Sequence, residues 1–438
     1  MKSNRPFKTI FLSFLLLFAC SPFCLAEDNS AQETDTYRQL ETFANILSIL
    51  QENYVEEINT RDAVEGAITG LLLSLDPHSS YLKPESYEEF QAETQGSFTG
   101  IGIEITLRDH VITVISPIAD TPAARAGIKA RDKIVKINGE PTRNKTPLDA
   151  VKLLRGEKGT KVTISIYREG EKELRDITLT RDTIPLHSVK SYEFMPGFGY
   201  ISISNFQNNT TMEFKQALDT LQQKGQLKGL VLDLRNNPGG LLSQAVSIAD
   251  IFLKKGLIVY TRGRNKKQDI TYEAHQTGPS LSCPMVVLVN EGSASASEIV
   301  AGAVQDHQRA VIVGTNTFGK GSVQTVIPLR NGAGLRMTTA RYYTPKGRSI
   351  QATGIVPDVE VASLAYVKPD TDKTEKDFFR ETDLSNHFNN ENGSEDTGTS
   401  AVTEGIQKKL EKDNQLRTAF NILKSLVLYT SYRRDEAP

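Results

Sequence analysis

A cluster of serines and one lysine further along the chain have the types and spacing that could do chemistry. Ser293, Ser295 and Ser297 follow the apolar run 285–289, and Lys320 stands between two glycines. The run has the length and β-branched content of a strand, and the Ala-rich stretch after the serines is typical of a helix. A hydroxyl and an amine placed in this way indicate a Ser-Lys nucleophile pair. The residues alone do not choose among the three serines.

Each of these residues also has a purely structural interpretation. Ser295 precedes Glu298 by three positions, a capping-box spacing that predicts a helix N-cap. Residues 314–320 fit the first part of a phosphate-binding loop, but Gly321 stands where Mg²⁺ binding needs a Ser or Thr. We therefore reject nucleotide binding, whereas an N-cap serine and a solvated surface lysine stay open on local grounds.

The composition is that of an ordinary globular protein. The chain has 438 residues, 38% hydrophobic and 24% charged, with a formal net charge of −2. This length predicts two or three domains. The charge gives no indication of nucleic-acid binding. The six histidines are scattered and no H-E-x-x-H occurs, so we expect no metal and no cofactor.

Residues 1–26 have the order of a secretory signal, with cations, then an apolar stretch, then small residues before an acidic pair. The apolar stretch is short for a membrane span. We therefore expect an exported protein of the bacterial periplasm or cell envelope. A lipobox-like stretch ending at Cys20 offers a less favoured alternative, lipidation and membrane association. Cleavage after Ala26 would leave only Cys283, expected to be a buried structural thiol.

Two amphipathic helices are predicted within residues 33–75, joined by a turn at 56–60. Their shared apolar stripe needs a partner surface, which is either the protein's own core or a second subunit. The turn that follows includes Asp76 and His78, and we expect His78 to be a capping or packing residue. A polar segment after residue 367 predicts a linker, and helical spacing returns over 410–428.

Gly100 and Gly102 lie in a short predicted loop that leads into an alternating strand. Such a loop exposes amides that can hold a terminal carboxylate, while the strand edge pairs with a peptide. Further strands at 111–115 and 132–139 and a short helix at 121–128 follow. In this order residues 97–181 strongly resemble a PDZ domain, with 148–154 as the helical wall of its groove. The alternative is a glycine-bearing structural hairpin. The resemblance implies a carboxylate-binding loop made of Gly100, Ile101, Gly102 and Ile103.

Past residue 181 strands alternate with helices, as in an α/β layer. The buried strand 229–234 ends in R-N-N-P-G-G, and a helix is predicted from Leu241 to Leu253. A double glycine at a helix N-terminus exposes unpaired amides at the positive end of the helix dipole, which suits a developing oxyanion. An ordinary tight turn is the structural alternative.

The segments S-A-S-A-S-E-I and F-G-K-G-S-V-Q closely resemble the carboxyl-terminal processing proteases, also called tail-specific proteases, over most of the chain. In that family the nucleophile lies twenty-five residues before the general-base lysine, and a glutamine lies four residues after it. The resemblance therefore implies Ser295 as nucleophile and Lys320 as base. It implies that Gln324, expected on the same strand as Lys320, orients the amine. The match to D-L-R-N-N-P-G-G implies an oxyanion hole of Gly239, Gly240 and Ala296.

The resemblance implies a serine endopeptidase that cleaves exported proteins near their C-termini through a Ser-Lys dyad. Its PDZ domain would bind substrate C-termini, and gating by that domain is a further hypothesis. Other hypotheses are a homodimer or higher oligomer through the terminal helices, and an adaptor protein. No nucleic-acid partner is expected.

The expected fold is multi-domain α+β, a PDZ domain inserted before an α/β core of ClpP/crotonase type, with helical N- and C-terminal extensions. The expected parts are a signal peptide (1–26), an N-terminal helical region (27–95), the PDZ domain (97–181), the protease core (182–365), an acidic polar linker (366–400) and a C-terminal helical region (401–438).

Three alternatives remain beside this hypothesis. Asp306 and His307 could form a Ser-His-Asp triad with Ser295, and His275 could take the same part. A catalytically silent PDZ-bearing scaffold of the cell envelope is the second, although such a protein has no need of the serine, lysine and glutamine together. An acyl-CoA hydratase-like enzyme is the third, and the PDZ-like insert makes it remote.

Overall fold

The computed structural model describes residues 29–275, 281–364 and 401–435. The expected signal peptide at 1–26 and the whole of the expected linker at 366–400 lie outside the described residues. The chain divides into two compact units, Met1–Ser74 and Leu75–Pro438. Each unit is described by itself.

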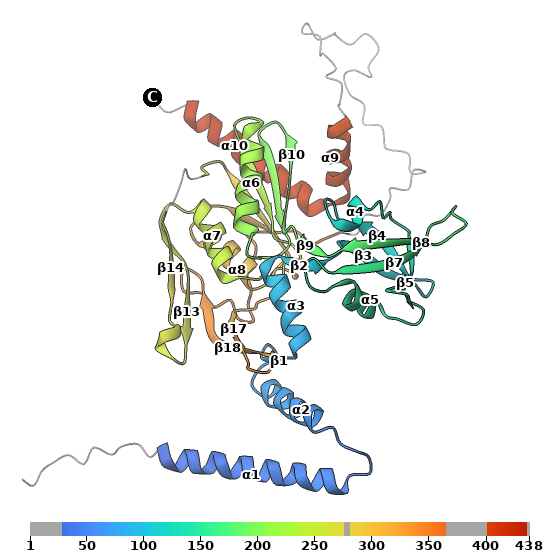
Figure 1. Cartoon of the computed structure of the whole chain (residues 1–438). Helices are drawn as coiled ribbons and strands as arrows, with labels where there is room; N and C mark the ends of the chain where they lie inside the picture. The colour runs from blue at the N-terminus through green and yellow to red at the C-terminus, as the bar shows by residue number, and fades with distance from the viewer. Residues whose placement is uncertain (1–28, 276–280, 365–400, 436–438) are drawn as a thin grey trace, which may run out of the picture. The chain divides into compact units, whose positions relative to one another are not determined.

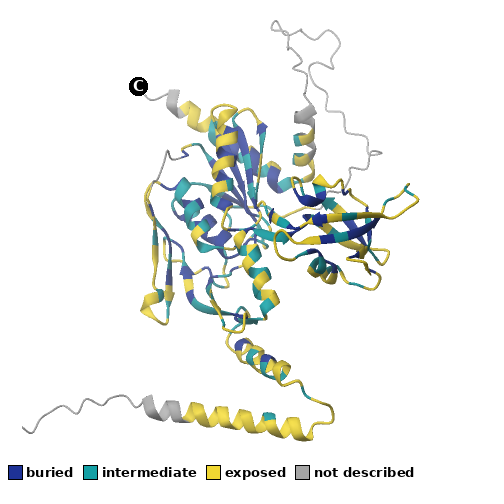
Figure 2. Cartoon of the chain, in the orientation of Figure 1, coloured by how far each residue is buried: buried dark blue, intermediate teal, exposed yellow. Residues whose placement is uncertain are grey.

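The first unit contains two helices, as the apolar spacing predicts. They are α1 (Asn29–Asn53) and α2 (Thr60–Leu73). Asn59 caps α2, because its side-chain oxygen accepts the backbone N–H groups of Arg61 and Asp62 at 3.0 and 3.3 Å. The apolar side chains of α1 are largely exposed (Figure 2), including Leu40 at 57% and Ile46 at 53%. The partner surface that this stripe needs therefore stays a prediction.

The second unit begins with a short strand and a helix and continues into a sheet with the strand and helix order expected of a PDZ domain (Figure 1). The elements are β1 (Ser80–Leu82), α3 (Pro84–Gln95), β2 (Ser97–Gly100), β3 (Ile103–Arg108), β4 (Val111–Pro117), α4 (Pro122–Arg125), β5 (Lys133–Ile137), β6 (Glu140–Pro141), α5 (Pro147–Leu154), β7 (Lys161–Tyr167), β8 (Arg175–Thr180) and β9 (Asp182–Pro185). The sheet order is β3-β4-β5-β7-β8, with β6 beside β5, and β2 pairs with β9 in a separate ribbon. The sheet of β3 to β8 has its own hydrophobic core, in which Ile112, Ile134 and Ile164 are fully buried.

The remaining elements build the core that was expected to carry catalysis. They are β10 (Val189–Met195), β11 (Phe198–Ile203), α6 (Thr210–Gln223), β12 (Gly229–Asp233), α7 (Leu242–Phe252), β13 (Gly256–Gly263), η1 (Lys266–Gln268), β14 (Thr271–Ala274), β15 (Met285–Val289), α8 (Ala296–Asp306), β16 (Val311–Gly314), β17 (Ser322–Pro328), β18 (Gly334–Tyr343), β19 (Val359–Glu360), α9 (Ala401–Lys412) and α10 (Asn414–Asp435). The PDZ domain before a core of mixed helix and sheet confirms the expected architecture.

The central sheet of the core has the order β10-β11-β12-β15-β16-β19, in which every pair is parallel except β10 with β11. Both faces of this sheet are covered, which explains the continuous apolar runs of β12 and β15. Side chains alternate along β12, so that Leu230 and Leu232 pack toward α6, α7 and α8, whereas Val231 packs toward α10.

Helix α10 covers one face of that sheet with Leu416, Ala419, Phe420 and Leu423, which have helical spacing and are buried. The sequence pattern predicted one helix over 410–428, and this prediction is wrong about continuity. The chain breaks between α9 and α10 at Asp413, whose carboxylate accepts the N–H of Leu416 at 2.9 Å. An N-cap carboxylate at this point starts a new helix.

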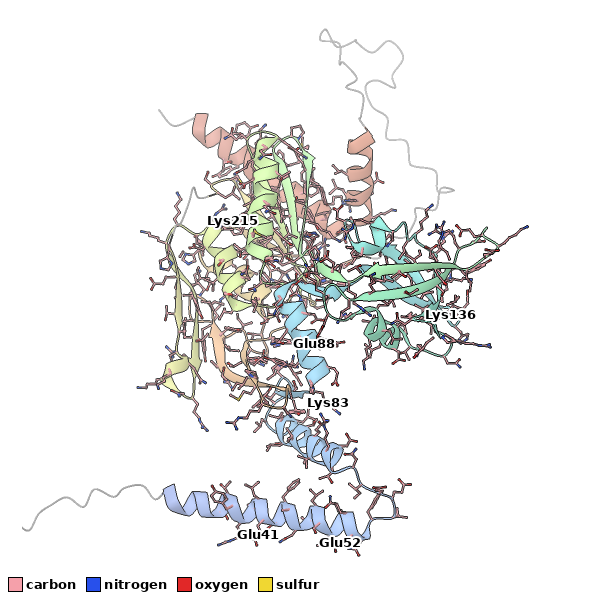
Figure 3. The ribbon with its side chains drawn as sticks, viewed as in Figure 1. Glu41, Glu52, Lys83, Glu88, Lys136 and Lys215 are labelled. Carbon is pink, nitrogen blue, oxygen red and sulfur yellow. The ribbon has the colours of Figure 1, made fainter. Side chains whose placement is uncertain are left out.

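A second, antiparallel sheet of order β1-β18-β13-β14, with β17 paired to β18, lies beside the core. Charged side chains such as Lys136 of β5, Lys215 of α6 and Glu88 of α3 are exposed (Figure 3). Within the described ranges, no helix has the length and hydropathy needed to cross a membrane.

Candidate active site

Ser295 lies at the turn between β15 and α8, as the strand-to-helix pattern predicts. It is the N-cap of α8 and is 8% exposed. Its backbone has φ 53° and ψ −110°, a conformation that non-glycine residues seldom adopt. Such strain persists only where the surroundings enforce it, and it is common at functional sites. The turn therefore holds Ser295 in a fixed, costly geometry.

The hydroxyl groups of the two neighbouring serines make structural hydrogen bonds. The hydroxyl of Ser293 donates to the Leu234 carbonyl at 2.8 Å, and that of Ser297 donates to the Asn237 carbonyl at 2.9 Å. Both serines are fully buried. The Ser295 hydroxyl donates to no backbone carbonyl among the described residues. The structure thus separates three serines that the sequence chemistry could not separate.

Glu298 connects Ser295 to the lysine loop. Its Oε2 accepts the backbone N–H of Ser295 at 2.8 Å and that of Lys320 at 2.9 Å. Its Oε1 accepts the N–H of Gly319 at 2.7 Å and the hydroxyl of Thr317 at 2.5 Å. The carboxylate is fully buried, and four donors satisfy it. The backbones of Ser295 and Lys320 are therefore within two hydrogen-bond lengths of each other.

The Lys320 side chain is half-buried, and its pKa is lowered from the ordinary lysine value. Burial is the main cause because it disfavours the charged ammonium, and the nearby positive charge of Arg336 adds to it. The negative charges of Asp76 and Glu298 act in the opposite direction. Lys320 in turn helps burial to lower the pKa of His78. The site favours a neutral amine at lower pH than free lysine would.

Gln324 lies on β17, but Lys320 lies in the loop that precedes this strand, so the expectation of a shared strand is wrong. The Gln324 Nε2 donates to the Ser322 hydroxyl at 2.8 Å and to Thr338 Oγ1 at 3.4 Å. No hydrogen bond joins Lys320 to Gln324 or to the Ser295 hydroxyl in the part of the chain that the structure describes. Their catalytic contacts stay predictions.

The glycine loop after β12 lies against Ser295. A Cβ added to Gly239 would lie 2.9 Å from the Ser295 Cβ and 3.0 Å from the Ala296 nitrogen. Only glycine fits there, and its φ of 105° requires one as well. The Gly239 N–H donates to Asn237 Oδ1 at 2.9 Å. Among the described residues, no backbone hydrogen bond of a turn, loop or helix end has the N–H group of Gly240 or of Ala296 as its donor. Ala296, as the first residue of α8, has no partner within the helix.

The histidine alternatives do not meet Ser295. Ser295 begins α8, and Asp306 and His307 end it, which separates them by about 16 Å at 1.5 Å per residue. His307 Nε2 contacts the Leu257 carbonyl at 2.7 Å. His275 is exposed and makes no contact with Ser295 among the residues the structure covers. The described residues therefore assemble no Ser-His-Asp triad around this serine.

The expected peptide-binding residues are Gly100, Ile101, Gly102 and Ile103, which run from the last residue of β2 to the first residue of β3. The Ile101 carbonyl accepts the N–H of Ala123 at 2.9 Å, and the Gly102 carbonyl accepts that of Ile118 at 2.9 Å. These two carbonyl groups are thus bonded within the domain. Strand β3 is an edge strand of its sheet, and α5 lies beside it. An open edge next to a helix is the arrangement that adds a peptide strand.

Sequence reasoning missed Asp76, Glu298 as a bridge, and Tyr342. Burial raises the pKa of Tyr342 to about 12, and a hydrogen bond with the Ser295 side chain partly offsets this effect. The capping-box spacing pointed to Glu298, but only as a partner of Ser295. No local signal could place Asp76, which reaches this region from 262 positions before Thr338. Within the described residues, no group of three or more His, Cys, Asp or Glu side chains could hold a metal.

Comparison with known proteins shows that the core following the PDZ domain is that of a serine-type peptidase. Residues 197–361 match peptidase family S41, residues 113–168 match the PDZ domain, and residues 23–86 match the activating protease CtpB N-terminal domain. The chain is 41% identical over 432 residues to the carboxy-terminal-processing protease of Bartonella bacilliformis, covering 98% of each. It is 38% identical over 332 residues to the carboxy-terminal processing protease CtpA of Bacillus subtilis, covering 75% of this chain and 70% of the relative.

A similar solved structure is the photosystem II D1 C-terminal processing protease, with 34% identity, 73% of this chain and 86% of that chain covered, and a TM-score of 0.43. On the strength of the sequence relatives, the chain belongs to the carboxy-terminal processing proteases of peptidase family S41.

Proposed function

We propose that this peptidase cleaves peptide bonds through a Ser-Lys dyad, with Ser295 as nucleophile and Lys320 as general base. The neutral Lys320 amine takes the proton of the Ser295 hydroxyl as its oxygen bonds to the scissile carbonyl carbon. The lysine then returns the proton to the leaving nitrogen as the C–N bond breaks. In the second half, Lys320 takes a proton from water as the water oxygen bonds to the ester carbon, and it returns the proton to the Ser295 oxygen as the ester C–O bond breaks. Gln324 orients the amine through its side-chain oxygen.

The observation that carries this proposal is the shared hydrogen bonding to Glu298 Oε2, which fixes the backbones of Ser295 and Lys320 side by side. The lowered pKa of Lys320 supports the same role, since a base must be uncharged to accept a proton. The direct contact between the Ser295 hydroxyl and the Lys320 amine is part of the proposal. Catalytic hydrogen bonds often tighten when substrate binds.

We propose that the backbone N–H groups of Gly240 and Ala296 stabilise the oxyanion, with Gly239 shaping the space around it. The contact of Gly239 with Ser295 supports this role, because a donor must lie close to the carbon that Ser295 attacks. The N–H of Gly239 itself already donates to Asn237, so it serves only if that loop rearranges. Gly240 and Ala296 are the favoured donors.

A cleavage assay on a short unstructured peptide tests the dyad. Ser295→Ala and Lys320→Ala should each lower turnover to a small residual rate, whereas Lys215→Ala, an exposed lysine of α6, should keep the parent rate. Equal hydrolysis in all four proteins would mean that other residues act. No hydrolysis in any of them would favour the scaffold alternative or a latent enzyme.

We further propose that the PDZ domain captures substrate C-termini and that cleavage occurs near them in exported proteins. The open β3 edge and the amide loop beside it support this. A peptide with a free C-terminal carboxylate should bind or be cleaved better than the same peptide with a C-terminal amide. Leu148→Arg, at an exposed position of α5, should remove the difference, whereas Lys136→Ala, at an exposed position of β5, should keep it. Equal treatment of both peptides by the parent protein would contradict C-terminal capture.

A further inference from the structure

Asp76 organises a turn that lies against β18, although most of the chain separates the two. Its Oδ1 accepts the N–H groups of His78 and Ser79 at 2.8 and 2.9 Å, and its Oδ2 accepts the Ser79 hydroxyl at 2.7 Å. The Thr338 hydroxyl also donates to Asp76 Oδ1, at 3.1 Å. The Thr338 N–H donates to the Ser79 hydroxyl at 3.2 Å. The turn is thus attached to β18 at one position through both main chain and side chain.

Thr338 relays this attachment to Gln324, which is its register partner on β17. A hydroxyl has one proton, and Thr338 gives it to Asp76. The Thr338 oxygen is left as an acceptor, so the donor end of the Gln324 amide, Nε2, must face it, as it does at 3.4 Å. The Ser322 hydroxyl accepts from the same Nε2 at 2.8 Å. The acceptor end, Oε1, is left for another donor.

We propose that Asp76 is a positioning residue of the active site, which acts through Thr338 to orient the Gln324 amide and through its own charge on Lys320. A carboxylate at position 76 fixes the direction of the Thr338 proton and therefore the face of the amide that is offered to the lysine. An Oε1 directed at Lys320 accepts an N–H and turns the lone pair of the amine toward Ser295. The inference rests on the proposed Ser-Lys mechanism.

The charge of Asp76 acts on the same lysine. Burial alone would raise the pKa of Asp76, but its hydrogen bonds lower the pKa below the usual aspartate value, so the group is ionised at neutral pH. The charged and titratable groups that act on Lys320 are Asp76 and His78 of the turn, Arg336 of β18 and Glu298 of α8. Arg336 favours the neutral amine, whereas Asp76 and Glu298 favour the ammonium. Asp76 therefore moves the pH at which Lys320 becomes a base upward.

Two substitutions separate the two effects. In Asp76→Asn the side-chain oxygen can still accept the bonds made to Oδ1, but the charge is gone. The rise of kcat with pH should shift to lower pH, with a plateau close to that of the parent. Thr338→Val keeps the charge of Asp76 and the shape of the side chain but removes the relay. In this variant the pH range over which kcat rises (the pH limb) should be unchanged. The kcat reached above that range, the plateau, should fall roughly tenfold to a hundredfold, with little change in KM.

The matched control is Thr339→Val on the same strand, which removes a hydroxyl that contacts Thr325 at 2.8 Å on the exposed side of the sheet. This variant should keep the parent plateau and limb. Thr338→Ser, which restores the hydroxyl, should recover the plateau. Thermal melting of all variants shows that each is folded, and a purely structural role would not move the pH limb.

An unshifted pH limb in Asp76→Asn, or a Thr338→Val plateau equal to that of Thr339→Val, overturns the proposal. Ser295→Ala and Lys320→Ala belong in the same series. If both hydrolyse peptide at the parent rate, the proposed dyad fails and this inference fails with it. If both are inactive while Asp76→Asn and Thr338→Val behave like the control, only the inference fails.

Discussion

The backbone N–H groups of Ser295 and Lys320 donate to a single carboxylate oxygen, Oε2 of Glu298. Because Glu298 lies in the first turn of α8, one residue fixes both the start of that helix and the loop that carries the lysine. Its other oxygen holds Gly319 and Thr317 of the same loop. The two halves of the proposed dyad are therefore coupled through a buried group that takes no part in the chemistry.

Glu298→Gln should disturb both halves at once. An amide has a similar shape but one acceptor and one donor end, so an NH₂ group in place of Oε2 would face the N–H groups of Ser295 and Lys320, which Glu298 now accepts. We expect a loss of unfolding free energy of roughly 1–3 kcal/mol and a loss in kcat of about a hundredfold. Urea unfolding and peptide hydrolysis measure the two effects. Glu291→Gln, an exposed neighbour before α8, is the control. Parent-like kcat in Glu298→Gln would show that the shared oxygen does not position the site.

The strained backbone of Ser295 predicts a difference between two inactive variants. At φ 53° and ψ −110° an alanine keeps the steric penalty, whereas a glycine relieves it. Ser295→Gly should therefore be more stable than Ser295→Ala by about 1 kcal/mol, despite the greater chain entropy of glycine. Denaturant midpoints with equal m-values test this. If the alanine variant is the more stable one, the turn is not strained at this residue.

Lys320 predicts a pH dependence of both rate and stability. Only the neutral amine accepts a proton, so kcat/KM should rise with pH through the Lys320 pKa, which burial places below that of a free lysine. The unfolded chain binds the proton more tightly than the folded one. The free energy of unfolding should therefore increase with pH between the Lys320 pKa of the folded chain and that of the unfolded chain. Below the pKa of the folded chain, the full cost of burying the charged ammonium is present.

Lys320→Met removes the buried charge and should be more stable than the parent at neutral pH. This gap in stability between variant and parent should close as the pH rises toward the pKa of free lysine. Thermal melts across this pH range measure the gap. Lys215→Met supplies the surface control. A gap that is absent, or that widens with rising pH, would show that the site does not lower the lysine pKa.

The loop that carries Gly239 and Gly240 is tied to the start of α10 by an ion pair. Arg235 at the head of that loop contacts Asp413 at 2.8 Å and Asp233 at 2.7 Å. Burial alone would raise the pKa of Asp413, but its hydrogen bond with Arg235 lowers the pKa below the usual aspartate value. The stabilisation is therefore complete above the unfolded-state pKa and is lost as pH falls through the folded pKa.

Asp413→Asn should cost about 1–2 kcal/mol at neutral pH, since the Asp413 side chain is 31% exposed and the pair is partly screened. The difference from the parent should shrink in acid. Urea midpoints at both pH values test this, with Asp219→Asn on the exposed face of α6 as control. A cost that does not depend on pH would exclude the ion pair as its source.

The sequence pattern predicts the main elements of the core well, because both faces of the β12 and β15 sheet are buried and their runs are continuously apolar. The helix break at Asp413 escaped prediction, since one capping carboxylate interrupts an otherwise periodic pattern. The choice among the serines needed either a family resemblance or coordinates. Only the distant acceptors of Ser293 and Ser297 show that those hydroxyls are engaged.

The contacts of Gln324 also escaped prediction. A strand pattern gives the face of the sheet on which Gln324 lies but not its partners. One partner, Thr338, comes from β18 and itself bonds to Asp76, 262 positions earlier in the chain. Spacing along β17 carries no trace of Asp76. Long-range polar contacts of this kind depend on how the sheets pack, which local periodicity does not contain.

A double-mutant cycle on peptide hydrolysis tests most directly whether Ser295 and Lys320 act as one unit. The rates of the parent, Ser295→Ala, Lys320→Ala and the doubly substituted protein are measured with one short peptide. Residues that work as a unit are strongly non-additive, so the double variant should retain the same residual rate as either single variant. Losses that multiply, or a single variant that hydrolyses like the parent, would contradict a shared catalytic role.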